Sequence, residues 1–183
     1  FNIQNCDHLL VESSRAISSG ADYNFGAWWS ENMVIRGNEF SGALRYPVKL
    51  SARSQSVLFE RNLVRTDRVR TNRGFHFTFF LRDSENATVR YNVFDARGSD
   101  ALSAGEFYDL KCDQRERHRI HNNLFIHDQK GRAGVRWTCQ EEVAFFNNIV
   151  VAAGPAHDFQ DERSAVETSH NIHFGIVEYR KDG

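Results

Sequence analysis

Short segments in which apolar and polar residues alternate recur along the whole chain, and six of them run into an asparagine. The segments are NMVIRGNEF, SVLFERNLV, NATVRYNVF, HRIHNNLFI, EVAFFNNIV and AVETSHNIH. Their asparagines are Asn38, Asn62, Asn92, Asn123, Asn148 and Asn171, spaced by 24, 30, 31, 25 and 23 residues. Periods of this length are typical of solenoid proteins, which stack repeated coils. Ser14, which lies 24 residues before Asn38 at the end of HLLVESS, marks a degenerate seventh copy.

The residues before each asparagine have the period of a β-strand. The positions three and five residues before it are mostly apolar, as expected for one buried face of a strand, and no segment shows the 3.6-residue period of a helix. The position two residues before it alternates in charge through Glu12, Arg36, Glu60 and Arg90. This alternation favours parallel strands that bring equivalent residues side by side. The position four residues before it (Leu10, Val34, Leu58) predicts an outward apolar stripe that another segment or a partner chain covers.

A second apolar pair follows each asparagine, so each coil is expected to turn there and begin another strand. Many short strands without helices can be buried together only if the chain coils and stacks on itself. The pattern therefore predicts an all-β parallel β-helix of about seven coils. Asparagine suits such a turn because it tolerates the left-handed backbone region and because stacked amides can hydrogen-bond between coils. We interpret the asparagines as structural rather than catalytic.

The repeated pattern hydrophobic-x-hydrophobic-x-x-Asn-x-hydrophobic, with doublets at Asn122-Asn123 and Asn147-Asn148, resembles a known family. It is similar to the right-handed parallel β-helix repeat of the pectate-lyase-like superfamily over nearly the whole chain. The resemblance implies a right-handed coil. It indicates fold more than function, because that superfamily includes polysaccharide lyases, glycoside hydrolases, epimerases, phage tailspikes and adhesins.

Composition and the two chain ends limit the domain organisation and the kinds of partner that are expected. With 183 residues, 40% apolar content and a net charge of −1, residues 1–183 are expected to form one β-helix domain. No segment approaches 18 apolar residues, and the basic residues are local and without a nucleic-acid-binding motif, so neither a membrane nor a nucleic acid is expected as a partner. Both ends look like uncapped β-helix, which predicts a domain that is incomplete at both ends. The missing part of its own chain or a neighbouring subunit would cover them.

Each coil contains a further strand, such as the one with alternating Tyr46, Val48 and Leu50. When these strands are aligned between coils, their outward positions predict a polar stripe. Aligned by alternation, the outward positions are Lys49, His76, Ser103, Arg136 and Asp158. The inward neighbours of His76 in this alignment are Phe75 and Phe77, and a slip of one residue would exchange the two faces. The stripe predicts a groove lined by Lys, His, Arg and Asp, which loops carrying Asp100, Glu106, Tyr108 and Asp161 could overhang.

Two reactions match these residue types. Eliminating a uronate needs a cation for the carboxylate, a base and an acid, and Lys49, His76 and Arg136 could supply the first two roles and Tyr108 the third. Glycoside hydrolysis needs two carboxylates facing one bond, and the candidates are Asp100, Glu106, Asp158 and Asp161. The alternative is that all of them are ordinary exposed charges on a solenoid surface.

Two further segments are candidates for binding a sugar chain. Arg68, Arg70 and Arg73, near Arg65 and Asp67, form a basic loop that could clamp carboxylates or sulfates, or could simply be solvated and make weak ion pairs. Trp28 and Trp29 follow Tyr23 and Phe25 and could form a platform for sugar rings or the core of a loop.

The histidines and cysteines indicate whether a metal cofactor is expected and in which cellular compartment the protein is found. The eight histidines are scattered without HExxH or CxxC spacing, so no metal or other cofactor is expected. His118 falls at an inward position and is expected to be a satisfied core histidine. A calcium site built from loop carboxylates would be in keeping with the superfamily, but no loop motif here supports one. Cys112 and Cys139 lie 11 and 9 residues before their asparagines, so they form a disulfide candidate, with buried free thiols as the alternative. A disulfide and the Asn86-Ala87-Thr88 sequon would fit a secreted, periplasmic or cell-surface protein.

Two functions therefore remain open. The first is a carbohydrate-active enzyme, a lyase or hydrolase acting on an acidic polysaccharide. The second is a non-catalytic β-helix that binds glycans or serves structural assembly, as in tailspikes and adhesins. The resemblance implies polysaccharide as the partner in the first case.

Overall fold

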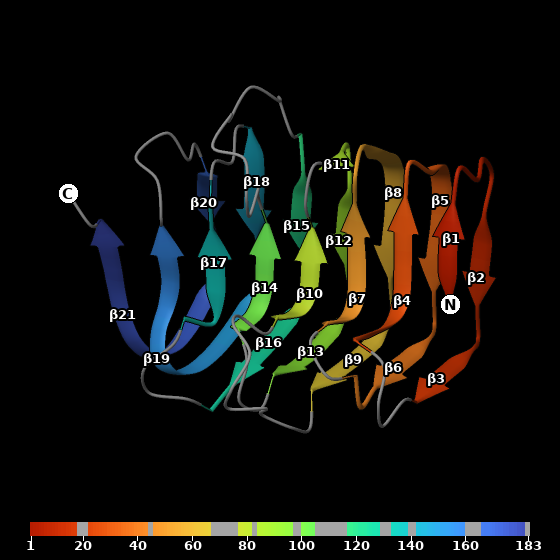
Figure 1. Ribbon diagram of the computed structural model, residues 1–183. Coiled ribbons are helices and arrows are strands. Elements are labelled where there is room, and N and C mark those ends of the chain that lie inside the picture. The colour runs from red at the N-terminus through yellow and green to blue at the C-terminus, as the bar shows by residue number, and fades with distance from the viewer. Residues whose placement is uncertain are drawn as a thin grey trace.

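The computed structural model of the chain consists of β-strands that return to the same three faces in successive coils (Figure 1). It describes residues 1–17, 22–43, 46–66, 77–81, 84–96, 100–104, 117–128, 133–138, 142–159 and 166–181. For residues 77, 100–104, 158 and 176–181 it describes the backbone alone. Among these residues there is no helix long and apolar enough to cross a membrane.

The three faces, which we name A, B and C, are each a stack of parallel strands. Face A contains β1 (Asn2–Gln4), β4 (Tyr23–Trp28), β7 (Tyr46–Ser51), β10 (Phe77–Leu81), β14 (Asp100–Ala104), β17 (Val135–Trp137) and the second half of β19 (Ile149–Phe159). Face B contains β2 (Leu10–Glu12), β5 (Glu31–Arg36), β8 (Ser54–Glu60), β11 (Ser84–Glu85), β12 (Thr88–Arg90), β15 (Arg119–His121), β18 (Val143–Phe146) and β20 (Val166–Ser169). Face C contains β3 (Arg15–Ile17), β6 (Glu39–Ser41), β9 (Leu63–Thr66), β13 (Val93–Ala96), β16 (Leu124–His127), the first half of β19 and the first part of β21 (Ile172–Lys181).

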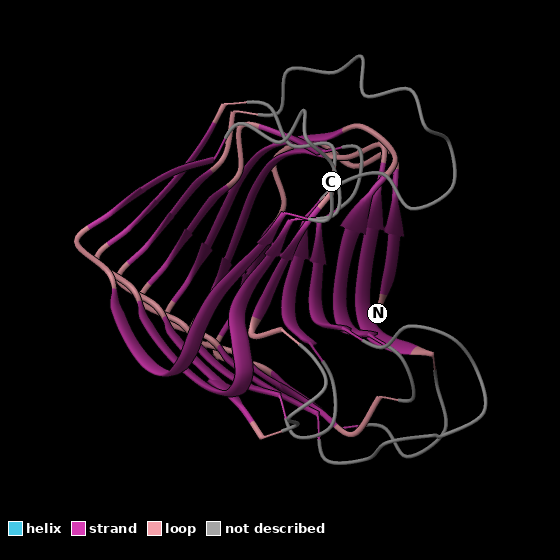
Figure 2. Ribbon diagram, turned by 90° about the vertical axis from the view of Figure 1, so that its left-hand side faces the viewer, coloured by secondary structure: helices cyan, strands magenta, loops and turns pink. Residues whose placement is uncertain are grey.

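The coil is right-handed. In Figure 1 the chain rises along face A, crosses to the far side, descends along face B and returns underneath along face C while it advances from right to left. Viewed along the stack, the three faces enclose a three-sided interior (Figure 2). The long strand β19 passes from face C to face A and joins these two faces into one sheet, whereas face B forms a second sheet. The prediction of an all-β parallel β-helix is confirmed.

The asparagines form a continuous hydrogen-bonded ladder at the corner between faces B and C. The backbone N–H and the side-chain Nδ2 of each one donate to the Oδ1 of the next, at 2.8–3.0 Å and 3.0–3.2 Å. Each Nδ2 also donates to a main-chain oxygen one coil earlier, as Asn92 does to Phe59 at 3.0 Å. Ser14 N–H donates to Asn38 Oδ1 at 2.9 Å, so the degenerate seventh copy is real. The ladder is structural in the sense predicted.

The prediction that the ladder asparagines themselves adopt the left-handed conformation is wrong. The left-handed residue is the one before each of them, with φ between 50° and 64°. These residues are Ser13, Gly37, Arg61, Tyr91, Asn122, Asn147 and His170. They turn the chain at the surface, and this turn directs the next side chain inward, where its amide can meet the amides of the neighbouring coils. The doublets Asn122-Asn123 and Asn147-Asn148 thus combine one residue of each kind.

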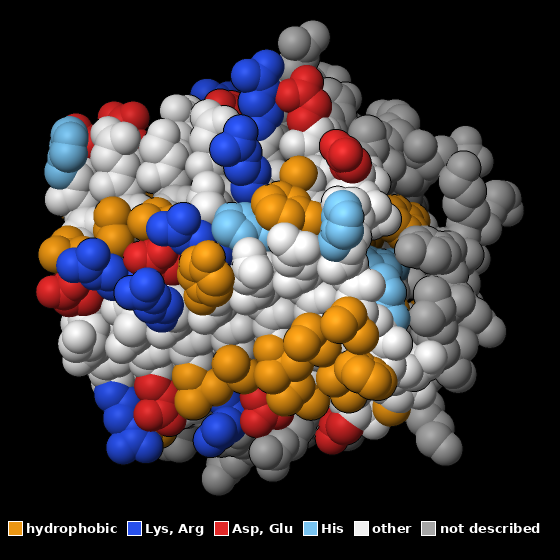
Figure 3. Space-filling model, turned by 180° about the vertical axis from the view of Figure 1, so that it is seen from behind, with side chains coloured by type: hydrophobic (Ala, Val, Ile, Leu, Met, Phe, Trp, Pro, Cys, Tyr) orange, Lys and Arg blue, Asp and Glu red, His pale blue; other side chains and the backbone are white. Residues whose placement is uncertain are grey.

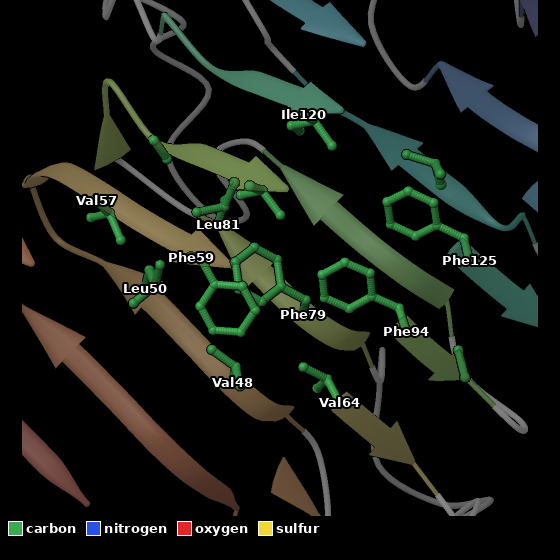
Figure 4. Packing of buried hydrophobic residues seen from close by; sticks show 14 of the residues in the cluster. Val48, Leu50, Val57, Phe59, Val64, Phe79, Leu81, Phe94, Ile120 and Phe125 are labelled. Carbon is green, nitrogen blue, oxygen red and sulfur yellow. The ribbon is translucent and has the colours of Figure 1, made fainter. Parts of the chain in front are cut away.

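Aromatic side chains fill the interior in a stack that runs along the coil axis (Figure 4). The ring of Phe79 lies 4.7 Å from Phe59 and 5.3 Å from Phe94, and Phe94 stacks on Phe125 at 4.9 Å, all measured between centroids. All four rings are fully buried. His118, predicted to be a satisfied core histidine, is 1% exposed, and its Nδ1 accepts the N–H of Ala87 at 3.2 Å. The inward positions read from the sequence before each asparagine are therefore correct for this part of the core.

The predicted pairing of charges along face B is also present. Arg36 contacts Glu12 at 2.7 Å, and Arg90 contacts Glu60 at 2.7 Å. In the next coils aromatic rings replace the charges at these positions, with His121 stacked on Phe146 at 4.7 Å. Figure 3 shows the charged side chains gathered over the part of this side that lies nearer the N-terminus.

The two ion pairs differ in burial, and we expect different costs for breaking them. The side chain of Glu60 is 9% exposed, whereas that of Glu12 is 44% exposed. The Arg90→Met variant should lower the free energy of unfolding by about 2 kcal/mol, because it leaves a nearly buried carboxylate without its cation. The Arg36→Met variant should cost less than about 0.5 kcal/mol. Urea unfolding of both variants measures the difference, and equal losses would contradict the role of burial.

Exposed apolar side chains form two groups on the surface. Leu10 is 54% exposed and stands in register with the half-buried Val34 and Leu58, as the sequence predicted; their cover by another segment or chain stays a prediction. On face C, Ile149, Ile172 and Phe174 are 38%, 53% and 59% exposed. Figure 3 shows a band of hydrophobic side chains low on the molecule.

Candidate functional site

The outward row of face A contains most of the residues that the sequence predicted to line a groove. From β7 to β19 the row is Lys49, Phe80, Ser103, Arg136 and Asp158, each paired in register with the next. The predicted alignment of Lys49, Ser103, Arg136 and Asp158 is therefore correct. Because side chains alternate along each strand, Lys49 and Arg136 lie on the side of the sheet opposite the buried Val48 and Val135. For Ser103 and Asp158 the backbone register alone is described.

The placement of His76 in this row is wrong. Phe80 occupies the register position between Lys49 and Ser103, and the inward residues beside it are Phe79 and Leu81 rather than Phe75 and Phe77. The stretch FHFTFFL allows two alternating alignments that differ by four residues, and strand pairing selects the later one. His76 itself lies outside the described residues.

A cluster of aromatic rings surrounds the ammonium group of Lys49. Its Nζ lies 5.7 Å from the centroid of Trp28, 5.8 Å from that of Tyr46 and 5.8 Å from that of Phe80. Tyr46 and Phe80 stack on each other at 5.1 Å and are 7% and 2% exposed. A cation over several ring faces is attracted by their quadrupoles and loses conformational freedom. The cluster therefore holds the Lys49 charge at a fixed place on face A.

The indole of Trp28 lies against face A because position 26 has no side chain. A Cβ at Gly26 would collide with the far edge of the Trp28 ring. Tyr23 contacts the same ring edge-on, with centroids 5.2 Å apart. Trp28 is half-buried, whereas Trp29, which follows in the turn to face B with φ of 48°, is 54% exposed. Of the two tryptophans predicted as a sugar platform, Trp29 is the more accessible.

The spacing of the row limits the chemistry that its members can share. Neighbouring strands lie ~4.8 Å apart, so Lys49 and Arg136, three strands from each other, are separated by ~14 Å. This backbone separation favours contacts of the two cations with different units of an extended ligand over joint action on one bond. Arg136 and Asp158 are on adjacent strands, although for Asp158 the backbone alone is described.

Several predicted residues lie outside the described residues. They are His76 and Tyr108 of the catalytic set, Arg68, Arg70, Arg73 and Glu106 of the binding set, and the disulfide candidates Cys112 and Cys139. In sequence they belong to the segments between β9 and β10, between β14 and β15 and between β17 and β18. Their roles stay predictions.

Two surface hollows lined by described residues lie away from face A. One, of about 490 Å³, is lined by Val143, Ala144, Val166 and Glu167 on face B. Another, of about 410 Å³, follows the asparagine corner beside Tyr91, Asn122 and Asn147. Neither includes a residue of the Lys49 row or its aromatic cluster. We take face A as the candidate site because it holds a cation among aromatic rings, one of which, Trp28, is partly accessible.

Sequence reasoning missed the part that Tyr46 and Phe80 play around Lys49. The Phe79-Phe80 doublet was a usable signal, because two adjacent aromatic residues in one strand must point to opposite faces. Tyr46 gave no comparable signal, since its contact with Phe80 joins different coils.

The arrangement of strands defines the class: this chain is a parallel β-helix. No protein-family model matches it, and no curated protein does. Among solved structures it is similar to the tailspike gp61 of Pseudomonas phage phi297, with a TM-score of 0.59 and 15% sequence identity. The similarity covers 94% of this chain and 36% of the tailspike chain, so the chain spans little more than a third of that protein's length.

Proposed function

We propose that the protein binds an acidic polysaccharide along face A, as a carbohydrate-binding β-helix. The observation that carries the proposal is the Lys49 ammonium held among Trp28, Tyr46 and Phe80; Trp29, which follows Trp28 in the chain, is 54% exposed. Aromatic faces suit the apolar faces of sugar rings, and a fixed ammonium suits a carboxylate or sulfate. Membership of the pectate-lyase-like superfamily and a secreted, periplasmic or cell-surface location are part of this proposal, and so is the absence of a required cofactor.

The row geometry favours an extended ligand over a compact one. Lys49 and Arg136 lie ~14 Å apart along the coil axis, which suits charges on different units of one chain better than two contacts to one unit. The similarity to a tailspike is consistent with this proposal but concerns the fold alone. A neighbouring subunit or a further part of the protein could extend the row beyond the coils described here.

Binding of polyuronates and sulfated glycans, measured by calorimetry, tests the proposal. Trp29→Ala should weaken binding about tenfold through loss of ring contact. Lys49→Gln should weaken it by a similar factor and flatten its dependence on salt concentration, because the lost contact is ionic. Gly26→Ala should act like a Trp28 variant by displacing the indole.

The control is Tyr91→Ala, which removes a 51% exposed aromatic ring at the asparagine corner, away from face A. This variant should bind like the original chain. Binding that survives Trp29→Ala and Lys49→Gln but fails in Tyr91→Ala would contradict the proposal and move the site to the corner.

A lyase or hydrolase is the second candidate function, supported by the adjacent positions of Arg136 and Asp158. In a lyase, Arg136 would neutralise the uronate carboxylate. Ultraviolet absorbance of unsaturated uronates tests for lyase activity, and release of reducing ends tests for hydrolase activity. Arg136→Ala should abolish either one while leaving binding at Lys49 in place.

A further inference from the structure

Two histidines replace apolar residues in the interior near the end of the described chain. The inward row of face A contains Phe25, Val48, Phe79 and Val135 before it reaches His157. The inward row of face C contains Phe40, Val64, Phe94, Phe125 and Val150 before it reaches His173. His157 and His173 thus occupy the places that Phe79 and Phe94 fill three coils earlier. Both rows become polar at the same coil, which calls for a physical explanation.

Hydrogen bonds link the two imidazoles to an indole. Trp137 Nε1 donates to His157 Nδ1 at 3.1 Å, and His157 Nε2 lies 3.0 Å from His173 Nε2. Trp137 is fully buried and His157 is 1% exposed, whereas His173 is half-buried. Trp137 belongs to β17, His157 to the face A half of β19, and His173 to β21. These hydrogen bonds therefore join three strands from two successive coils.

The indole determines the protonation of both rings. An indole N–H can only donate, so His157 Nδ1 must accept, and the neutral ring carries its proton on Nε2. That proton is donated to His173 Nε2, which must accept, so the proton of His173 lies on Nδ1. If His173 gained a second proton, two N–H groups would face each other at 3.0 Å. The arrangement also disfavours a metal ion between the rings, because His157 Nε2 is not free to ligate one.

The surroundings offer little to stabilise a charged ring. The described ring neighbours of His157 are Trp137, Phe145, Phe159 and His173, from β17, β18, β19 and β21. The titratable residues on the strands around the pair are Arg136 on β17, Asp158 on β19, Glu167 on β20, His127 on β16, and Glu178, Tyr179, Arg180 and Lys181 on β21. The backbones of Arg136, Asp158 and Arg180 are in register, and Tyr179 is the register partner of His157. His127 is buried and in register with Ala152.

We propose that the Trp137–His157–His173 hydrogen-bond chain is a proton-operated latch that holds β21 against β19, and with it β20 against β18, and releases both strands on acidification. Burial, and the charge of His173, lower the pKa of His157 from its ordinary 6.5 to about 3. Burial also lowers the pKa of His173. Below pH 6.5 these histidines bind protons in the unfolded segment but stay neutral in the folded segment. The free energy of unfolding of the segment therefore falls as the pH drops from 6.5 toward 3. The latch is independent of any glycan bound at face A.

Nitrogen-15 NMR of the histidine rings tests the hydrogen-bond chain in the unmodified protein. At pH 7.5 His157 should be neutral with its proton on Nε2, and His173 neutral with its proton on Nδ1. A cationic His173 at this pH, or either ring in the other tautomer, would overturn the latch. This measurement does not depend on whether any variant folds.

Hydrogen exchange, corrected for the intrinsic effect of pH, tests the release. Between pH 7.5 and pH 5, exchange of the amides in residues 166–181 should accelerate more than tenfold relative to those of β5 and β8. The His157→Phe/His173→Phe variant recreates the Phe79–Phe94 pair and should show no such acceleration, whatever its stability at pH 7.5. The His173→Gln variant keeps an acceptor for His157 and should respond less than the original chain.

The matched control is His8→Gln, because the side chain of His8 is 79% exposed and lies far from the pair in sequence, on the first coil. It should keep the full response to acid. If the Phe/Phe variant responds to acid as strongly as the original chain, or if residues 166–181 exchange no faster than β5 and β8, the proposal fails.

Discussion

Replacing Phe79 by alanine is expected to lower the free energy of unfolding by about 4 kcal/mol. The ring is fully buried between Phe59 and Phe94, which lie 4.7 Å and 5.3 Å away and belong to two other faces of the coil. Its removal loses the transfer energy of a large side chain and leaves a cavity. The rigid sheets around that cavity cannot collapse, because every strand is hydrogen-bonded to the coils on both sides.

Equilibrium unfolding in urea measures this loss, with Tyr91→Ala as the control. Tyr91 is 51% exposed, and its recorded ring contacts are with Arg90 and His121 at the surface. The control should cost less than about 1 kcal/mol. A loss below about 2 kcal/mol for Phe79→Ala would mean that the stack of rings does not support the fold as described.

Replacing Asn148 by alanine is expected to cost about 3 kcal/mol. Its Oδ1 accepts from the N–H and the Nδ2 of Asn123 at 2.9 and 3.0 Å, and its Nδ2 donates to the main-chain oxygen of Ile120 at 2.9 Å. The same Nδ2 also donates to Asn171 Oδ1 at 3.2 Å, so alanine removes a partner from two donors and two acceptors at a position that is 1% exposed. The penalty comes mainly from these buried polar groups, because each has lost its hydrogen bond with water as well.

The neighbouring Asn147 provides a matched control in the same doublet. Its φ is 53°, a conformation that glycine adopts without strain, and its exposed side chain takes no part in the ladder. The Asn147→Gly variant should therefore be neutral within about 0.5 kcal/mol, or slightly more stable. Similar losses in both variants, measured by thermal unfolding, would contradict the division of roles between the two asparagines.

The fold could be predicted from the sequence because its determinants repeat. Each coil supplies an asparagine, inward apolar residues at positions three and five before it, and a further strand after it, so errors in one coil are corrected by the others. The left-handed residue was misassigned because asparagine is common both at such turns and in ladders, as Asn122-Asn123 shows. Only the hydrogen bonds separate the two roles.

The candidate site was less predictable because it depends on contacts between coils. Alternation within a strand placed Lys49 and Arg136 in one row, yet it could not choose between the two alignments of FHFTFFL that put His76 or Phe80 beside Lys49. The pairing of β10 with β7 decides that choice. This pairing depends on how many residues connect β9 on face C to β10 on face A, which alternation within a strand does not show. The aromatic cluster was missed for the same reason, since Trp28, Tyr46 and Phe80 come from three coils.

At the corner between faces B and C, two residues connect the strands in every coil: a left-handed residue and the residue of the hydrogen-bonded ladder. The hydrogen bonds of the ladder leave no room for additional residues there. The two longest repeats, of 30 and 31 residues, instead carry their extra length elsewhere, as in residues 67–76 before β10 and 105–116 before β15. The molecule therefore separates a spine that repeats from coil to coil from two edges that carry longer segments. For protein engineering this makes those edges the natural places to graft recognition loops, and it makes the asparagine corner the one to leave untouched.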